Sequence, residues 1–422
     1  DWTDGNPAVN DDKFIRKNNS DKFTLTQAFK FDLTKNLNFR VSANWFYNEV
    51  INESFNKDFL ASPGNINRTR ASSANFSRDF SQTYNGTLNY NTTINDKHHL
   101  DAMIGMEYYD IYRNGIFASG SGAPSDDFMD LQYTSPDKDK RSIDSFHTEQ
   151  SILSFFTRVN YDYNEKYLLT LTARRDGYSK LLENRWGTFP GVSMGWKMDK
   201  EEFFKSFPDA INTLKLRASY GENGNVNDDL IGPYTLQGSY GSSKYDGNVG
   251  FQLSQLPFPD LKWERSATFE VGLDTRLFNR LDLGVALYQR KTHDKISNFF
   301  LPATSGITTI TTNLGSMQNK GIEVDLNYNI IKKTDFSLNF SANVAYNTNE
   351  ILKLPNNGLE NNRIGGSQVY DGNGNLVWVG GLQEGQNPNV AYAYVAEGII
   401  RTQAELDAYA LQLRDLIGAR TL

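Results

Sequence analysis

Few side chains in this sequence suit acid–base, nucleophilic or metal chemistry. The chain has four histidines and no cysteine, which leaves no thiol nucleophile and no thiolate metal ligand. His98 and His99 are adjacent, whereas His147 and His293 each stand alone. Catalysis requires a nucleophile, a base and an orienting group within hydrogen-bond reach, and no spacing here suggests one. We therefore expect solvated surface histidines, no enzyme activity and no cofactor.

Asp371 to Asn375 (DGNGN) matches the start of a calcium-binding loop, with oxygen-bearing side chains at alternate positions. The complete pattern requires glycine at its sixth place and glutamate at its twelfth, where this chain has Leu376 and Leu382. The motif therefore predicts a tight turn and no metal site.

Aromatic side chains offer a better means of recognition, because they make up 13% of the chain. A flat ring gives a large contact area at low entropic cost, which suits sugars and peptide side chains. The alternative is that a given ring packs a loop or belongs to a membrane girdle. Seven rings in or beside the longer connections are the candidate substrate-binding residues: Tyr178, Trp186, Tyr234, Tyr240, Tyr245, Tyr370 and Trp378.

The elements that must position these rings have a period of two. From Leu37 to Tyr47 the odd positions are apolar or aromatic, and the even positions from 38 to 44 are polar; Ile322 to Asn329 also alternates between apolar and polar residues. Such alternation predicts strands with one apolar and one polar face. About twelve strands are expected, at 21–34, 37–50, 79–94, 98–113, 148–163, 166–176, 186–198, 213–221, 263–277, 281–294, 312–330 and 335–349.

These segments are long enough for a membrane. Fourteen residues extend about 46 Å, and a tilt near 45° leaves about 33 Å of height, more than an apolar band of about 25 Å. Short and long connections also alternate, except for a short outer turn at 177–185 and a longer inner one at 199–212. Outer-membrane barrels have short periplasmic turns and long external loops. The predicted fold is thus an all-β, antiparallel transmembrane barrel, with turns at 95–97 and 278–280 facing the periplasm. The predicted external loops are 51–78, 114–147, 222–262, 295–311 and 350–389.

Other features narrow the class of protein. No apolar run approaches the roughly 18 residues of a membrane helix, and the net charge of −7 gives no basic surface for nucleic acid. Thr402 and Glu405 form a capping box ahead of apolar residues at helical spacing, so 402–417 is predicted to be one short amphipathic helix. Lys200 to Phe207 is a second, shorter candidate helix.

The sequence resembles the SusC/RagA family of TonB-dependent transporters of the Bacteroidetes. The resemblance runs through the stretches ILSFFTRVNYDYNEKYLLTLTARRDGYSK (152–180), NRWGTFPGVSMGWK (184–197), LKLRASYGENGN (214–225), LKWERSATFEVGLD (261–274) and NLGSMQNKGIEVDLNY (313–328). It implies an outer-membrane barrel of about 22 strands around a plug. It also implies opening by TonB, a SusD-like surface lipoprotein as lid, and import of oligosaccharides or oligopeptides. Residues 1–422 are then expected to be part of the barrel domain, with plug, TonB box and closing strands outside this chain.

Two other functions fit the same residues. An ungated pore or secretion barrel shares every barrel argument, and a plug of about a hundred residues upstream would distinguish the importer from it. A soluble β-rich glycan-binding adhesin would pack its apolar strand faces together as a sandwich core. A sandwich stays monomeric in buffer, whereas a barrel exposes that face to lipid.

Overall fold

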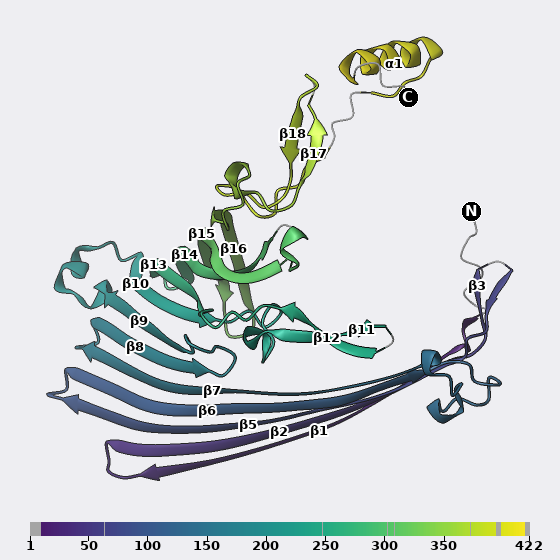
Figure 1. The fold of residues 1–422 in the computed structure, drawn as a ribbon. Helices are drawn as coiled ribbons and strands as arrows, with labels where there is room; N and C mark the ends of the chain where they lie inside the picture. The colour runs from purple at the N-terminus through teal and green to yellow at the C-terminus, as the bar shows by residue number, and fades with distance from the viewer. Residues whose placement is uncertain are drawn as a thin grey trace. The chain divides into compact units, whose positions relative to one another are not determined.

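The structure is a computed structural model that describes residues 10–62, 64–246, 248–301, 303–307, 309–371, 373–393 and 398–417 (Figure 1); the side chains of 243–245 and 412–417 are also outside the description. Twelve strands form one antiparallel sheet in chain order. They are β1 (Phe14–Asp32), β2 (Leu37–Asn56), β5 (Ala71–Ile94), β6 (His98–Gly120), β7 (Arg141–Tyr163), β8 (Tyr167–Tyr178), β9 (Trp186–Lys197), β10 (Ile211–Asn225), β13 (Glu264–Leu277), β14 (Leu281–Phe300), β15 (Thr309–Lys332) and β16 (Ser337–Lys353). The all-β antiparallel prediction is confirmed.

The chain divides into two compact units. The first comprises Asp1–Asn164, Leu169–Pro190 and Ile231–Leu261; the second comprises Glu165–Leu168, Gly191–Leu230 and Lys262–Leu422. We describe each unit by itself.

In the first unit, β1, β2, β5, β6 and β7 pair in continuous register, and neighbouring rows alternate in character. One row of directly paired residues is apolar: Phe29, Val41, Gly86, Met106 and Phe155. The row beside it is polar apart from its first residue: Ala28, Ser42, Asn85, Glu107 and Ser154. Successive side chains on a strand point to opposite faces, so this unit has one apolar and one polar face.

The second unit repeats the arrangement on β9, β10, β13, β14, β15 and β16. Its apolar row is Trp196, Leu216, Leu273, Val285, Val324 and Val344. The adjacent row on the other face is Lys197, Lys215, Asp274, Gly284, Asp325 and Asn343. The alternation read from the sequence is therefore confirmed in the register of six neighbouring strands.

The inner strand ends agree with prediction within a few residues, but several outer ends extend further. β2 continues to Asn56 rather than 50, β5 begins at Ala71 rather than 79, and β7 begins at Arg141 rather than 148. The predicted loops at 51–78 and 114–147 are thus too long, and the residues between the paired strands are 57–70 and 121–140. The regular alternation of apolar and polar residues ends there, while backbone pairing continues.

Shorter elements lie outside the sheet. The described residues include three hairpins: β3 (Phe59–Ser62) with β4 (Asn65–Asn67), β11 (Ser239–Tyr245) with β12 (Asn248–Gln255), and β17 (Ser367–Tyr370) with β18 (Leu376–Val379). 3₁₀ turns occur at η2 (Leu131–Tyr133), η3 (Lys138–Lys140), η4 (Met198–Lys200), η5 (Glu202–Ser206), η6 (Thr235–Gln237), η7 (Ala303–Ser305) and η8 (Glu360–Asn362). Two of them cover the second predicted helix, so that segment is 3₁₀ rather than α.

The predicted C-terminal helix is present as α1 (Gln403–Ile417). The Thr402 hydroxyl accepts a bond from the Glu405 backbone N–H, and the Glu405 carboxylate accepts one from the Thr402 N–H, as a capping box requires. None of the helices in the described ranges has the length and apolarity needed to span a membrane.

Candidate functional site

The polar face of the second unit carries a groove of about 440 Å³. Lys197, Lys215, Asp274 and Asp325 line it, and all four belong to the polar row given above. Gly284 lies in the same row and adds no side chain, which leaves the space open. The two lysines lie together at one end of this row and the two aspartates lie at the other, so the groove is polar and carries charges of both signs.

Arg217 lies two residues beyond Lys215 on β10, toward the outer strand end and on the same face. Its guanidinium forms ion pairs with Glu270 and, at 3.5 Å, with Asp274. Gly272 lies beneath it, and a Cβ at that position would come within 2.5 Å of the guanidinium carbon. The missing side chain lets Arg217 lie flat against the sheet and reach both carboxylates.

The first unit holds a similar cluster around Arg174. Arg174 contacts Glu107 at 3.1 Å, Asp176 at 2.7 Å and the Ser154 hydroxyl at 2.8 Å. Its guanidinium also lies 5.5 Å from the ring centroid of Phe156. Both arginine clusters are locally compensated, which weakens the field that either presents to a passing solute.

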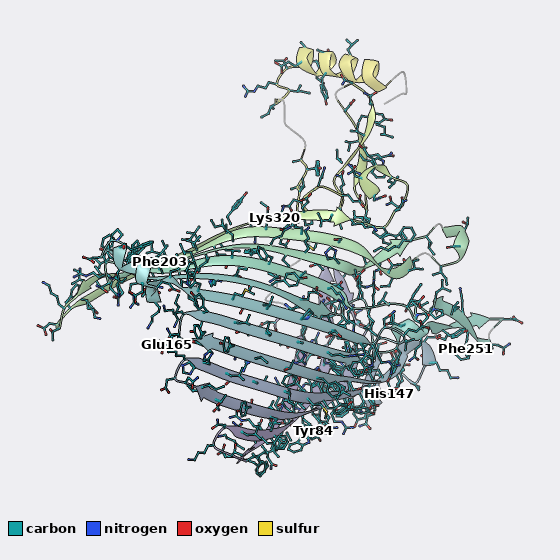
Figure 2. All side chains as sticks on the ribbon, turned by 90° about the vertical axis from the view of Figure 1, so that its left-hand side faces the viewer. Tyr84, His147, Glu165, Phe203, Phe251 and Lys320 are labelled. Carbon is teal, nitrogen blue, oxygen red and sulfur yellow. The ribbon has the colours of Figure 1, made fainter. Side chains whose placement is uncertain are left out.

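A compact cap covers the outer end of the first unit. Leu181, Ile231 and Leu236 are at most 1% exposed, and Lys180, itself 4% exposed, donates to the Ile231 carbonyl at 3.1 Å. From this base the β11–β12 hairpin continues outward, with Phe251 beyond the strand ends (Figure 2). Within the glycine- and serine-rich stretch, Ser239–Tyr245 is thus a paired strand rather than an adaptable coil, because residues 248–255 give it a partner strand.

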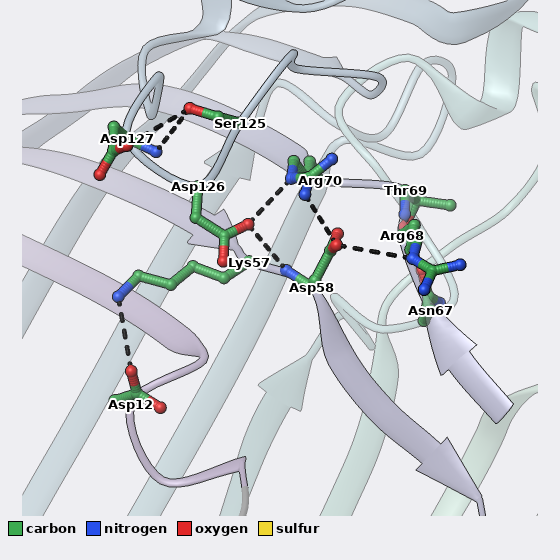
Figure 3. A network of polar contacts seen from close by, with 10 residues as sticks. All are labelled: Asp12, Lys57, Asp58, Asn67, Arg68, Thr69, Arg70, Ser125, Asp126 and Asp127. Carbon is green, nitrogen blue, oxygen red and sulfur yellow. Dashed lines mark hydrogen bonds and ion pairs between the residues drawn. The ribbon is translucent and has the colours of Figure 1, made fainter. Parts of the chain in front are cut away.

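A second network joins the loops 57–70 and 121–140 (Figure 3). Arg70 donates to Asp58 at 2.7 Å and to Asp126 at 2.8 Å, while the Asp58 N–H donates to Asp126 at 3.1 Å. The hydrogen bond from Arg70 lowers the pKa of the Asp126 carboxyl. Sequence reasoning did not find this network, because its partners are 12 and 56 residues apart and no local pattern links them.

Of the candidate aromatic residues in the first unit, Tyr178 and Trp186 are in positions that loop packing or a girdle explains. Tyr178 is 6% exposed and donates to Gln150 at 3.5 Å. The ring of Trp186 stacks on Phe155 at 6.3 Å, on the apolar face.

The other candidates present more ring surface. Tyr234 is 46% exposed, and its hydroxyl accepts a bond from the Glu149 N–H at 3.3 Å; Tyr240, on β11, is 72% exposed. Tyr245 ends β11, and its side chain lies outside the described residues. In the second unit, Tyr370 and Trp378 occupy diagonal positions on one face of the β17–β18 hairpin, 69% and 38% exposed.

An inner connection of the second unit is fixed by Glu201. Its carboxylate accepts bonds from the Tyr167 hydroxyl at 2.6 Å, the Lys166 ammonium at 3.1 Å and the Trp196 indole N–H at 3.2 Å. These donors, that of Tyr167 first, lower the pKa of Glu201. The cluster joins β8, β9 and the 3₁₀ segment, and gives that longer connection a rigid base.

The predicted turn at 371–375 is confirmed. The Asp371 carboxylate accepts the backbone N–H groups of Asn373 and Asn375 at 2.9 and 2.8 Å, which lowers its pKa and closes the β17–β18 hairpin. Over the ranges that the structure describes, no three metal-binding side chains converge. His98 and His99 bond separately, to Tyr161 at 2.7 Å and to Thr93 at 3.0 Å.

Comparison with known proteins identifies the family to which this architecture belongs. Residues 1–417 match the family described as TonB dependent receptor-like, beta-barrel. The chain is 32% identical over 360 residues to TonB-dependent receptor P39 of Formosa agariphila, covering 83% of this chain and 33% of that protein. It is 34% identical over 265 residues to TonB-dependent receptor SusC of Bacteroides thetaiotaomicron, covering 60% of this chain and 25% of that protein.

Solved structures agree. The fold is similar to that of the RagAB peptide transporter, with a TM-score of 0.75 and 26% identity, over 88% of this chain and 40% of that one. A structure of the RagAB peptide importer in the "open-open" state matches with a TM-score of 0.74 and 26% identity, over 87% and 39% of the two chains. The chain spans about a third or less of the curated relatives reported above.

Proposed function

This chain belongs to the TonB-dependent receptor-like β-barrel family, whose members are transporters and not enzymes, and we propose that it forms part of the wall of an importer of oligomeric nutrients. Its place is the outer membrane, with the apolar face against lipid. The resemblance to SusC and RagA stated from the sequence is confirmed. The proposed substrates are oligosaccharides or oligopeptides, and the name of the RagAB peptide importer favours the peptide.

The exposed apolar face argues against the soluble adhesin. A sandwich would bury this face, yet Phe29 is 57% and Val344 66% exposed. An aqueous channel in contact with the polar face accounts for the opposite row of lysine and aspartate residues.

The observation that carries the import proposal is the compensation of charge along the polar face. Arg174 in the first unit and Arg217 in the second each pair with two carboxylates, and the groove of the second unit has both Lys and Asp side chains in its lining. Such a wall hydrates a large polar solute without holding ions of one sign. Selection would then rest with the external loops.

We assign contacts with substrate or lid to the exposed loop aromatics of each unit, which are Tyr234 and Tyr240 in the first and Tyr370 and Trp378 in the second. Tyr245, whose side chain lies outside the described residues, is kept as a candidate from the sequence. Tyr178 is buried and Trp186 shares the apolar face with Phe155, so their proposed roles are loop packing and membrane girdle. The proposed partners are a plug, TonB and a SusD-like surface lipoprotein, and residues 1–422 are proposed to be one part of the barrel domain.

Uptake by cells tests this function. Cells that carry the intact gene should accumulate fluorescent oligopeptides or oligosaccharides larger than a porin admits, and deletion of the gene or of TonB should abolish the accumulation. Accumulation that persists without TonB would favour the ungated pore. If the gene deletion changes uptake of neither class, the proposal is wrong.

A further inference from the structure

Two consecutive arginines on β8 have opposite surroundings. Arg174 lies on the polar face between Glu107 and Asp176. Arg175 must therefore lie on the apolar face, where its guanidinium is 5.4 Å from the ring centroid of Trp186. Among the residues described, no carboxylate forms an ion pair with Arg175. An arginine on a lipid-facing surface without a protein counter-charge calls for a partner from the membrane.

The depth of Arg175 indicates what that partner offers. Phe155 stacks on Trp186 and lies eight residues from Tyr163, which marks the inner end of β7. Eight residues extend about 26 Å, or about 20 Å of height at the usual tilt, within an apolar band of about 25 Å. Arg175 is therefore near the outer edge of the band, on the side of the long loops, where the headgroups of the outer leaflet lie.

A groove of about 540 Å³ runs across the apolar face beside Arg175. It crosses the strands from Phe39 on β2 to Thr188 on β9, with apolar walls. Its floor is low because Gly86 has no side chain and Thr157 and Ala173 have smaller ones than the neighbouring Ile104, Met106 and Phe155. The groove is thus elongated and apolar, and the guanidinium of Arg175 lies in its lining without a carboxylate partner in the described part of the chain.

We propose that this groove holds an acyl chain of a phosphorylated glycolipid of the outer leaflet, with the lipid phosphate bound by Arg175. A guanidinium presents paired N–H donors that match phosphate oxygens, and stacking on Trp186 holds it in one orientation. An uncharged lipid would fill the groove but leave Arg175 without a counter-ion. The site is on the outer wall, so it is separate from the proposed nutrient path.

Binding of purified lipid A to the full-length protein in detergent, followed by native mass spectrometry, tests this site. Wild-type protein should bind lipid A at least about tenfold more tightly than chemically dephosphorylated lipid A. Arg175→Ala should remove that preference, and Arg175→Lys should keep part of it, because an ammonium retains charge but loses the fork. Ala173→Trp fills the floor and should weaken both lipids.

The matched control is Ala102→Trp, since Ala102 is on the same face of β6, between Tyr90 and Val159, and does not line the groove. It should bind like the wild type. Equal preference for phosphorylated lipid in wild type and Arg175→Ala, or equal binding in wild type and Ala173→Trp, would overturn the proposal. Equal affinity for phosphatidylglycerol would overturn the glycolipid assignment. Heat-modifiable migration on a gel verifies assembly; if Arg175→Ala does not assemble, Arg175→Lys and Ala173→Trp decide the outcome.

Discussion

The connections at the inner ends of the strands and those at the outer ends are held by different kinds of interaction. Three inner turns each contain two consecutive residues with positive φ, at Asn95 and Asp96, Asn164 and Glu165, and Phe278 and Asn279. Such pairs match the two-residue hairpin turns whose twist suits antiparallel strands. The outer connections are instead fixed by distant contacts, such as Arg70 with Asp126 and Lys180 with Ile231. Local geometry therefore closes these three inner turns, whereas contacts between distant residues organise the outer connections and the longer inner connection at Glu201.

The largest expected effect comes from reversing the polarity of the wall between these two ends. Val324 faces lipid in the middle of an apolar row, so Val324→Arg should cost about 2–4 kcal/mol and reduce assembled protein in the outer membrane. Asp325→Arg, one residue along on the polar face, is the matched control and should assemble. Heat-modifiable migration measures assembly. Equal yields of the two variants would contradict the face assignment.

The second largest effect is expected on substrate affinity, when aromatic residues of an outer connection are replaced. Replacing Tyr240 and Tyr245 together by Ala should weaken binding on the order of tenfold, because each ring lost removes contact area in the external hairpin. Trp186→Phe keeps an aromatic ring on the apolar face and should leave the affinity unchanged. Calorimetry with the purified complex reports binding. Full affinity in a correctly assembled double variant would move recognition to the polar wall.

A smaller, local effect is expected from Arg70→Ala. The change leaves Asp58 and Asp126 facing one another without their shared cation, so the loops 57–70 and 121–140 should separate while the sheet persists. Protease added to intact cells should then cut these loops several-fold faster and still spare 95–97 and 278–280. The experiment should be repeated without the proposed lipoprotein lid, which would shield the loops. Cleavage at 95–97 on intact cells would reverse the topology.

The smallest effect is a pH dependence of the same network. Arg70 lowers the pKa of Asp126, so the stabilising contribution of Asp126 is present above its unfolded value of about 3.9 and is lost as the pH falls through the lower folded value. Hydrogen exchange of the 121–140 loop, measured relative to the intrinsic rate at each pH, should show a loss of protection below about pH 4 in the wild type. Arg70→Ala should exchange faster at neutral pH and show less change. Identical pH profiles would remove Asp126 from the network.

The sequence predicted what repetition encodes. Alternation over the segment around Val324 indicated the strand and its two faces, because a slip of one residue would carry Glu323 and Asp325 into lipid. The Thr402 capping box likewise located α1, since both of its bonds are local.

Contacts between distant segments were not predictable from one sequence. Nothing local to Lys180 indicates that the Ile231 carbonyl will bury it, and nothing around Trp186 separates an external ring from one stacked on Phe155. The extensions of β5 and β7 were missed for a related reason: their few large apolar residues, Phe76, Ile143 and Phe146, do not recur with a period of two.

Spin labels placed one residue apart test the central claim most directly, which is that one face of each unit meets lipid and the other meets water. Labels at 324 and 325 probe the second unit, and labels at 155 and 154 probe the first. Collision with oxygen should be greater at 324 and 155, and collision with a water-soluble paramagnetic reagent greater at 325 and 154. The reverse order at either pair, in protein reconstituted into bilayers, would contradict the assignment of the faces.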